Sequence, residues 1–525
     1  MKPLELLPQR GFPARSLMDN AAVTALLSTF PMFLVCPWSL LLNTDMGWSW
    51  SNWKMWWSHD PFLQEVVRFS LWCRGITFFM QVAFNQLIPD HNADAFSPPR
   101  LGPNTLGDNI VELLFGGLGR WDAEHFLFIA EHGYVYEHNM AFFPLLPLLI
   151  GGLAQGPLLP LAGLLRLRSR LLISSAFLNC VCSTLAAVSL YLLGCVTLQS
   201  RRSAFLSALL FCMSPVSIFM ASTYSESLYV LATFAGLWQL QKHRTICSSA
   251  FLSLATAARS NGLVNAGFLL HSTVKEAIQR KNYSGKLLQT IFGIVLIILP
   301  FVLFQCFCFV RSCLESDENQ QIPQELVQLA IEKGYRVHKT HIPAWCSLRF
   351  PLAYSHIQSE YWDVGLFRYF KLQQLPNFLL ASPVMILSIC TILEYTSSNL
   401  ELCRTLGLWK VQSKYTNGFY GPHVFVYVAH LAALTGFGFL CMHVQVLTRL
   451  LFSSCPVLYW FCSHVIHKNE PWILGLKRGK TVSNPALQLL LAWTSLQQGT
   501  RIILAYFFGY WVIGTALHVN FLPWT

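Results

Sequence analysis

Long apolar stretches constrain the fold of this chain more than any other feature of its sequence. Several run for about twenty residues, the length that an α-helix needs to cross a hydrocarbon layer of about 30 Å. Hydrophobic residues make up 54% of the chain and charged residues only 12%, which excludes an ordinary soluble domain. The stretches do not alternate as barrel strands would, so we expect an all-α, polytopic membrane protein.

The apolar stretches predict about ten or eleven transmembrane helices. The first expected span covers residues 66–88, and residues 485–500 are expected to form a short interfacial helix. The other expected spans are 142–164, 171–197, 204–222, 228–241, 247–270, 287–310, 375–394, 422–440, 442–464 and 502–519.

Residues 1–54 allow two interpretations. Residues 21–42 are apolar, and five tryptophans lie between residues 48 and 57, a composition typical of a membrane interface. The segment is either an uncleaved signal or extra span, or an extension upstream of a start at Met55. Residues 55–525 are expected to form a single transmembrane domain.

The distribution of basic residues predicts which loops share a side of the membrane. Loops 271–286, 400–415 and 466–480 are the richest in lysine and arginine, so we expect them in the cytoplasm. The two longest polar segments, 89–141 and 311–372, then lie together on the lumenal side. The net charge of +11 comes from such connectors, which is typical of helix ends at a membrane, and we expect no nucleic-acid partner.

Three smaller features bear on the loops. Cys313 and Cys346 flank the largest polar loop and can form a disulfide if that loop faces an oxidising lumen. A probable helical pattern runs from Pro323 to Lys333, with an apolar stripe at Leu326, Val327, Ala330 and Ile331. The sequon at Asn282 falls in a loop expected on the cytoplasmic side, so we expect it to be unmodified.

The polar stretch from residue 120 to residue 138 repeats the pair Glu-His three times. A metal site is not expected there, because His125 and His132 would lie about 10.5 Å apart along a helix. We expect instead an amphipathic helix in the membrane interface, displaying its acids toward the lumen. Its apolar stripe would consist of Ala123, Phe126, Leu127 and Ala130.

Asp122 stands at the expected N-terminal end of this helix. Asp122 either takes part in binding or catalysis, or it only caps the helix, with Trp121 as an interfacial anchor.

Several strings in the sequence resemble the PIG-V family of mannosyltransferases, within the GT-C class of glycosyltransferases. The resemblance covers essentially everything from Met55 onward and nothing in residues 1–54, which favours the upstream-extension interpretation. The strings are RWDAEHFLFIAEHGY, HNADAFSPPRL, RSNGLV, PNFLLA, CMHVQVLTR and NFLPWT.

The resemblance implies transfer of the second mannose, in α-1,6 linkage, to the glycosylphosphatidylinositol (GPI) precursor. The donor would be dolichyl-phosphate-mannose, the location the lumenal face of the endoplasmic reticulum membrane, and no cofactor would be needed. A β-linked donor and an α-linked product require inversion, which needs one base for the attacking hydroxyl. Asp122 is the candidate base, with Arg120 and Trp121 shaping its pocket and Glu124 and His125 supporting it.

A cation should stabilise the phosphate that leaves the donor. Arg449 and His443 are the first candidates and Arg259 is the second, although each is also explained by snorkelling or by hydrogen bonds between helices. Arg120 either holds this phosphate or contacts a lipid headgroup.

Two further acids need an interpretation. Glu226 is an acid near membrane depth, where an acid is by default a candidate for function. Its expected position toward the cytoplasm favours the alternative interpretation, a structural clamp. Asp363 is the runner-up base, ranked lower because the first Trp-Asp pair belongs to the family motif.

Two rival functions remain open. One is a lipid transporter or flippase, although such proteins often contain inverted repeats, which this sequence does not show. The other is a non-catalytic subunit of a membrane glycosyltransferase, in which Asp122 would be replaceable.

Overall fold

The computed structural model is helical throughout the residues that it describes. Apart from one antiparallel bridge between Tyr136 and Val337, these residues form helices and connecting loops, so the all-α prediction is confirmed for them. The expected apolar span at 21–42 and the sequon at Asn282 lie outside the described residues. The described ranges, all within the compact unit Met55–Thr525, are 60–280, 284–314, 322–337, 342–411, 415–475 and 484–524.

Within these ranges, five helical segments are long and apolar enough to cross a membrane, and a sixth candidate is a helix pair bent by 80°. The chain is therefore a multi-pass membrane protein. The bent pair is α18 (Leu447–Ser454) with its preceding turn, followed by α19 (Pro456–Asn469). The five are built on α7 (Leu167–Leu198), α12 (Ser284–Phe309), α15 (Leu375–Ser398), α17 (Phe425–Cys441) and α21 (Gln498–Val519).

Several stretches expected as single spans are broken or shortened in the structure. The stretch 247–270 divides into α10 (Thr245–Ala258), a 3-10 turn and α11 (Ala266–Arg280). In that turn Gly262 packs so closely on the backbone of Thr256 that a Cβ atom would not fit. The stretch 442–464 breaks where Pro456 begins α19, because proline cannot continue a preceding helix.

The stretches 142–164 and 204–222 contain only the short helices α6 (Leu145–Gln155) and α8 (Arg201–Cys212).

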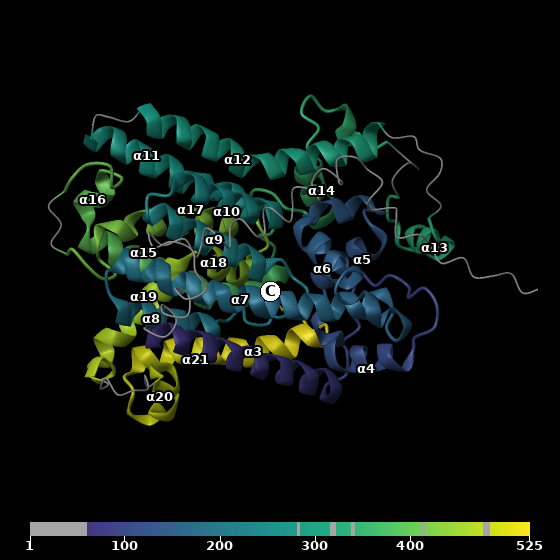
Figure 1. Cartoon of the computed structure of the whole chain (residues 1–525), viewed down its shortest axis with the longest axis horizontal. Coiled ribbons are helices and arrows are strands. Elements are labelled where there is room, and N and C mark those ends of the chain that lie inside the picture. Colours follow the sequence, from purple (N-terminus) through teal and green to yellow (C-terminus); the bar gives the residue numbers. More distant parts are fainter. Residues whose placement is uncertain are drawn as a thin grey trace, which may run out of the picture. The chain divides into compact units, whose positions relative to one another are not determined.

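Helix α9 (Glu226–Gln241) lies at the centre of the packing. Its residues from Glu226 to Gln239 are buried on every face, as expected for a helix surrounded by other helices. It packs against α7, α10 and α18, while α3 (Pro61–Leu87) packs against α7 and α21 on the other side of α7 (Figure 1). The first residue of α9 is therefore held inside the helical core.

The two long polar segments, 89–141 and 311–372, pack against each other. Helices α4 (Leu106–Phe115) and α5 (Asp122–His132) belong to the first, and α13 (Gln324–Lys333) and α14 (Ala353–Trp362) to the second. The expected helix at 323–333 is thus confirmed, but Val327 and Ile331 are exposed and only Leu326 and Ala330 of the stripe are buried.

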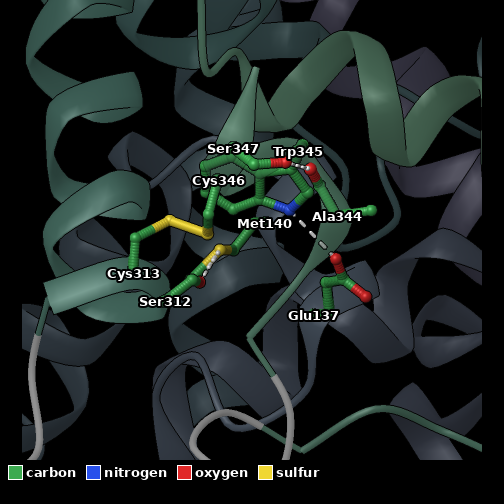
Figure 2. The surroundings of a disulfide bond; sticks show 8 residues. All are labelled: Glu137, Met140, Ser312, Cys313, Ala344, Trp345, Cys346 and Ser347. Atoms are coloured by element: carbon green, nitrogen blue, oxygen red, sulfur yellow. Dashed lines mark hydrogen bonds between the residues drawn. A yellow bond between two sulfur atoms is a disulfide. The ribbon is translucent and has the colours of Figure 1, made fainter.

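The contact between the two segments centres on the buried carboxylate of Glu137. It accepts hydrogen bonds from the Trp345 indole at 3.0 Å and from the Tyr361 hydroxyl at 2.8 Å. Figure 2 shows Trp345 beside the disulfide that joins Cys313 to Cys346, the pairing considered from the sequence. Segment 311–372 is therefore held on segment 89–141 by hydrogen bonds to Glu137, and it is closed internally by the disulfide.

Candidate active site

Asp122 is the first residue of α5, and an unusual backbone conformation places it there. The preceding residue, Trp121, has φ of +58°, a region that non-glycine residues rarely adopt. Such a conformation costs on the order of 1–3 kcal/mol and persists only where the surroundings enforce it. Here the Trp121 indole packs 5.8 Å from the ring of Phe521, near the chain's C-terminus.

Asp122 is not a helix cap. Trp121 occupies the N-cap position and makes no capping hydrogen bond with its side chain. The backbone N–H of Asp122 donates to the hydroxyl of Tyr224 at 3.2 Å, and its carboxylate accepts a hydrogen bond from Arg449. The capping interpretation left open by the sequence is therefore wrong.

Helix α5 does not lie in an interface with its acids displayed, as the sequence had predicted. Every residue from Ala123 to Ala130 is buried, and the helix packs against α6 and α7. The buried Glu124 is accommodated because Arg100, at 2.9 Å, and Arg168 both bind its carboxylate. Burial raises the pKa of the Glu124 carboxyl, but the two arginines lower it more, so the group is ionised.

Four side chains with alternating charges meet at the N-terminal end of α5. We call them the ionic cluster: Asp122, Arg449, Glu226 and Arg259. Arg449 Nη1 donates to Asp122 Oδ2 at 2.8 Å, and Arg449 Nε lies 3.3 Å from Glu226 Oε1. Arg259 binds the same oxygen of Glu226. The four residues come from α5, α18, α9 and the C-cap of α10.

Asp122 is the member of the ionic cluster that is most open to a ligand. Its side chain is 37% exposed, whereas that of Arg449 is 11% exposed and that of Glu226 is fully buried. Burial raises the pKa of the Asp122 carboxyl, but the charge and the hydrogen bond of Arg449 lower it more, so the pKa lies below the ordinary aspartate value. At neutral pH the site therefore presents an ionised, accessible carboxylate.

Aromatic rings enclose the other side of Arg449. Its guanidinium carbon lies 5.3 Å from the ring centres of both Phe219 and Tyr224, within the range of a cation–π interaction. Tyr224 thus contacts Arg449 with its ring and Asp122 with its hydroxyl.

Glu226 lies on the same side of the molecule as Asp122, contrary to the sequence-based placement toward the cytoplasm. The charge count had treated 204–222 as a complete span. In the structure α8 ends at Cys212, and the chain returns through turns to Thr223, whose N–H binds the carbonyl of Leu118 beside α5. The span was miscounted, and the acid belongs to the ionic cluster.

The guanidinium of Arg120 is held by partners other than Asp122. It pairs with Asp90 at 3.0 Å and lies 4.7 Å from the ring centre of Phe521. Together with Glu124 it lines a cavity of about 220 Å³, whose other charged lining residues are Arg100, Glu112 and Arg168.

His125 belongs to an aromatic stack and interacts electrostatically with the carboxylate of Asp122. Its ring lies between those of Phe96 and Phe142, at 4.4 and 4.3 Å, and its Nδ1 is 3.3 Å from the amide oxygen of Asn139. Burial lowers the pKa of His125, so the ring is neutral and supports the position of α5 by packing.

Asp363 and His443 interact electrostatically with each other and form a group separate from the ionic cluster. Asp363 is 56% exposed and pairs with Lys371 at 3.0 Å. His443 bonds the carbonyl oxygen of Trp362 and stacks on Tyr369 at 4.4 Å. Of the two cations first considered, the structure places Arg449 beside Asp122 and places His443 beside the runner-up acid.

The sequence model described as "Mannosyltransferase (PIG-V)" matches residues 63–525. The chain belongs to the PIG-V mannosyltransferase family. It is 47% identical to the GPI alpha-1,6-mannosyltransferase 2 of Cricetulus griseus and to that of Homo sapiens, over 89% of this chain and 100% of each relative. The GPI mannosyltransferase 2 of Drosophila melanogaster is 28% identical over 88% of this chain and 100% of its own length.

Among solved structures, the chain is similar to the archaeal oligosaccharyltransferase AglB from Archaeoglobus fulgidus. The TM-score is 0.42 at 13% identity, over 85% of this chain, and the chain spans 56% of that protein.

This PIG-V mannosyltransferase is a glycosyltransferase, and its ionic cluster contains one acid whose position beside Asp122 the sequence did not predict. Glu226 was separated from Asp122 by the miscounted span. The two arginines that bind the buried Glu124, Arg100 and Arg168, were also missed, although Arg168 stands in a conspicuously basic connector. In the ranges that the structure describes, no group of three or more His, Cys, Asp or Glu residues could hold a metal ion.

Proposed function

We propose that this PIG-V mannosyltransferase adds the second mannose, in α-1,6 linkage, to the GPI precursor, with dolichyl-phosphate-mannose as donor. The observation that carries the proposal is the pairing of Asp122 with Arg449, an accessible ionised carboxylate beside a buried guanidinium. The relatives at 47% identity are named for an α-1,6 transfer in GPI synthesis, which supports the linkage and the acceptor.

The pairing suits an inverting transfer. An acceptor hydroxyl oxygen attacks the anomeric carbon of mannose, and its proton passes to the Asp122 carboxylate. The bond from that carbon to the phosphate oxygen breaks, and the phosphate leaves with the electron pair. Arg449, with Arg259 behind Glu226, supplies the positive charge that this leaving phosphate requires.

We assign the site to the lumenal side of the endoplasmic reticulum membrane. A disulfide joins Cys313 to Cys346, and disulfides persist in oxidising compartments such as that lumen. The segment that carries the disulfide packs on Glu137, in the same polar segment as Asp122. The lipid substrates would then approach from within the membrane.

The match to residues 63–525 supports a single catalytic unit beginning near Met55, with residues 1–54 as an extension. We further propose that α3, α6, α9 and α10 join the five long helices and the bent pair in the membrane domain, which brings the number of crossings to about ten in a GT-C-type arrangement.

Complementation tests the proposed reaction. Cells lacking the endogenous activity would receive the wild-type chain, Asp122→Asn or Asp363→Asn, and surface GPI-anchored proteins and the accumulated lipid would be measured. We expect wild type and Asp363→Asn to restore anchoring. Asp122→Asn should leave a one-mannose precursor at normal protein abundance, because the base is lost.

The matched pair of Trp-Asp variants also separates the rivals. Full rescue by Asp122→Asn would contradict the assignment of Asp122 as base, and failure of Asp363→Asn alone would make Asp363 the base. Accumulation of a lipid other than the one-mannose precursor would contradict the proposed reaction.

A further inference from the structure

Glu226 is a buried carboxylate that no substrate can reach. Its side chain is fully buried at the start of α9, inside the helical core. One of its oxygens, Oε1, contacts both Arg259 and Arg449, while Oε2 has no hydrogen-bond partner among the described residues. An uncompensated buried carboxylate is strongly unfavourable, so its charge must be tied to the two arginines.

The two carboxylates hold different parts of the Arg449 guanidinium. Asp122 accepts a hydrogen bond from the terminal Nη1, and Glu226 Oε1 forms an ion pair with Nε at 3.3 Å, without a hydrogen bond, nearer the side-chain stem. The rings of Phe219 and Tyr224 pack against the same group. If Asp122 releases Nη1, Glu226 and the rings still fix the guanidinium in place.

Such a release is required by the proposed reaction. The bond to Arg449 occupies an oxygen of Asp122 and lowers its basicity, so a carboxylate that keeps this bond is a poor proton acceptor. The phosphate of the donor can take over the Nη1 contact, because guanidinium binds phosphate and carboxylate with the same geometry. This exchange of Asp122 for phosphate requires that the Arg449 guanidinium keep its position when its bond to Asp122 is broken.

We infer that Glu226 is a positioning residue that anchors Arg449 through its Nε side, so that Arg449 can exchange Asp122 for the donor's phosphate and leave Asp122 free to accept the hydroxyl proton. The inference rests on the proposed function. In the step itself the acceptor oxygen bonds the mannose carbon, the carbon–phosphate oxygen bond breaks toward the phosphate, and the proton moves to Asp122. Glu226 takes no part in bond making.

A double-mutant cycle on the purified full chain tests this inference. Glu226→Gln keeps the shape of the side chain and removes its charge, so kcat at saturating donor should fall on the order of 10- to 100-fold through a misplaced Arg449. Because Glu226 acts through Arg449, adding Glu226→Gln to Arg449→Gln should lower kcat by less than about twofold more. The conservative Glu226→Asp should retain intermediate activity.

A matched control is Asp60→Asn, which changes another buried carboxylate paired with an arginine, Arg201. It should alter the melting temperature but not kcat. If Glu226→Gln does not fold, the same cycle is measured with Glu226→Asp, which retains the charge.

Unchanged kcat in the single Glu226 variant would overturn the inference. So would a full additional loss on the Arg449→Gln background, because it would show that Glu226 acts independently. Either result leaves the proposed function intact as long as the wild-type enzyme transfers mannose to the one-mannose precursor. Absence of that transfer in the wild-type enzyme would refute the proposed function itself, and a fully active Asp122→Asn enzyme would refute the role of Asp122 as base.

Discussion

At the scale of the residue, Asp122 and Arg449 were selected from the sequence, but their contact was not. They are separated by 327 positions in the chain, and nothing in the pattern around either residue indicates the other. Arg449 stood out because a charge interrupts an apolar stretch, which is a general signal of function in membrane proteins. His443 gave the same signal six residues earlier, yet it bonds the Trp362 carbonyl, because the chain turns between the two residues.

The ion pair predicts how activity depends on pH. Transfer requires ionised Asp122, so kcat/KM should be lost on acidification only below the ordinary aspartate pKa, since Arg449 lowers the pKa of this carboxyl. Arg449→Gln removes that attraction and leaves the burial that raises the pKa. The acid limb of the profile should therefore move to higher pH in this variant, in addition to a lower maximum.

Other charged and titratable groups near Asp122 are retained in that variant: His125, Tyr224, Glu226, Arg259 and His518. The profile would be measured as initial transfer rates between about pH 2 and 8, so that the acid limb below the ordinary aspartate pKa falls within the range. An acid limb that stays in place would show that Asp122 is not the group titrating.

At the scale of the element, the helix containing Asp122 was predicted in the right place but with the wrong surroundings. Residues 122–132 form α5 as expected, since the local pattern is helical. Its acids suggested exposure, whereas Glu124 is buried against Arg100 and Arg168 from distant segments. The local sequence pattern predicts that these residues form a helix. It does not predict which distant residues bury that helix.

A core substitution in α5 tests this burial. Leu127 is fully buried in a cluster with Leu171 and Leu172 of α7, so Leu127→Ala should destabilise the protein by about 2–5 kcal/mol. The melting temperature of the detergent-purified chain would show the loss. Leu113→Ala, which truncates an exposed leucine of α4, is the control and should leave the melting temperature nearly unchanged. Equal effects of the two variants would argue for a surface-lying α5.

At the scale of the whole molecule, hydropathy predicted the all-α membrane fold class. It did not predict where the apolar stretches break between helices. Apolar length predicts helices in a membrane, but the breaks at Gly262 and Pro456 come from backbone contacts and from proline within otherwise continuous apolar sequence. When a broken stretch is counted as a complete span, the residues that directly follow it are expected on the wrong side of the membrane. Glu226 was misplaced in this way. The ionic cluster exists only because four helical segments converge.

The central claim is that Asp122 is the base of the mannosyl transfer. Its most direct test is the single-turnover rate of the purified enzyme with dolichyl-phosphate-mannose and a one-mannose GPI acceptor, comparing wild type with Asp122→Asn at equal folded concentration. We predict a rate lower by about 10²- to 10⁴-fold, the usual contribution of a general base, with donor affinity changed only a few-fold. A variant that transfers mannose at the wild-type rate would contradict the account.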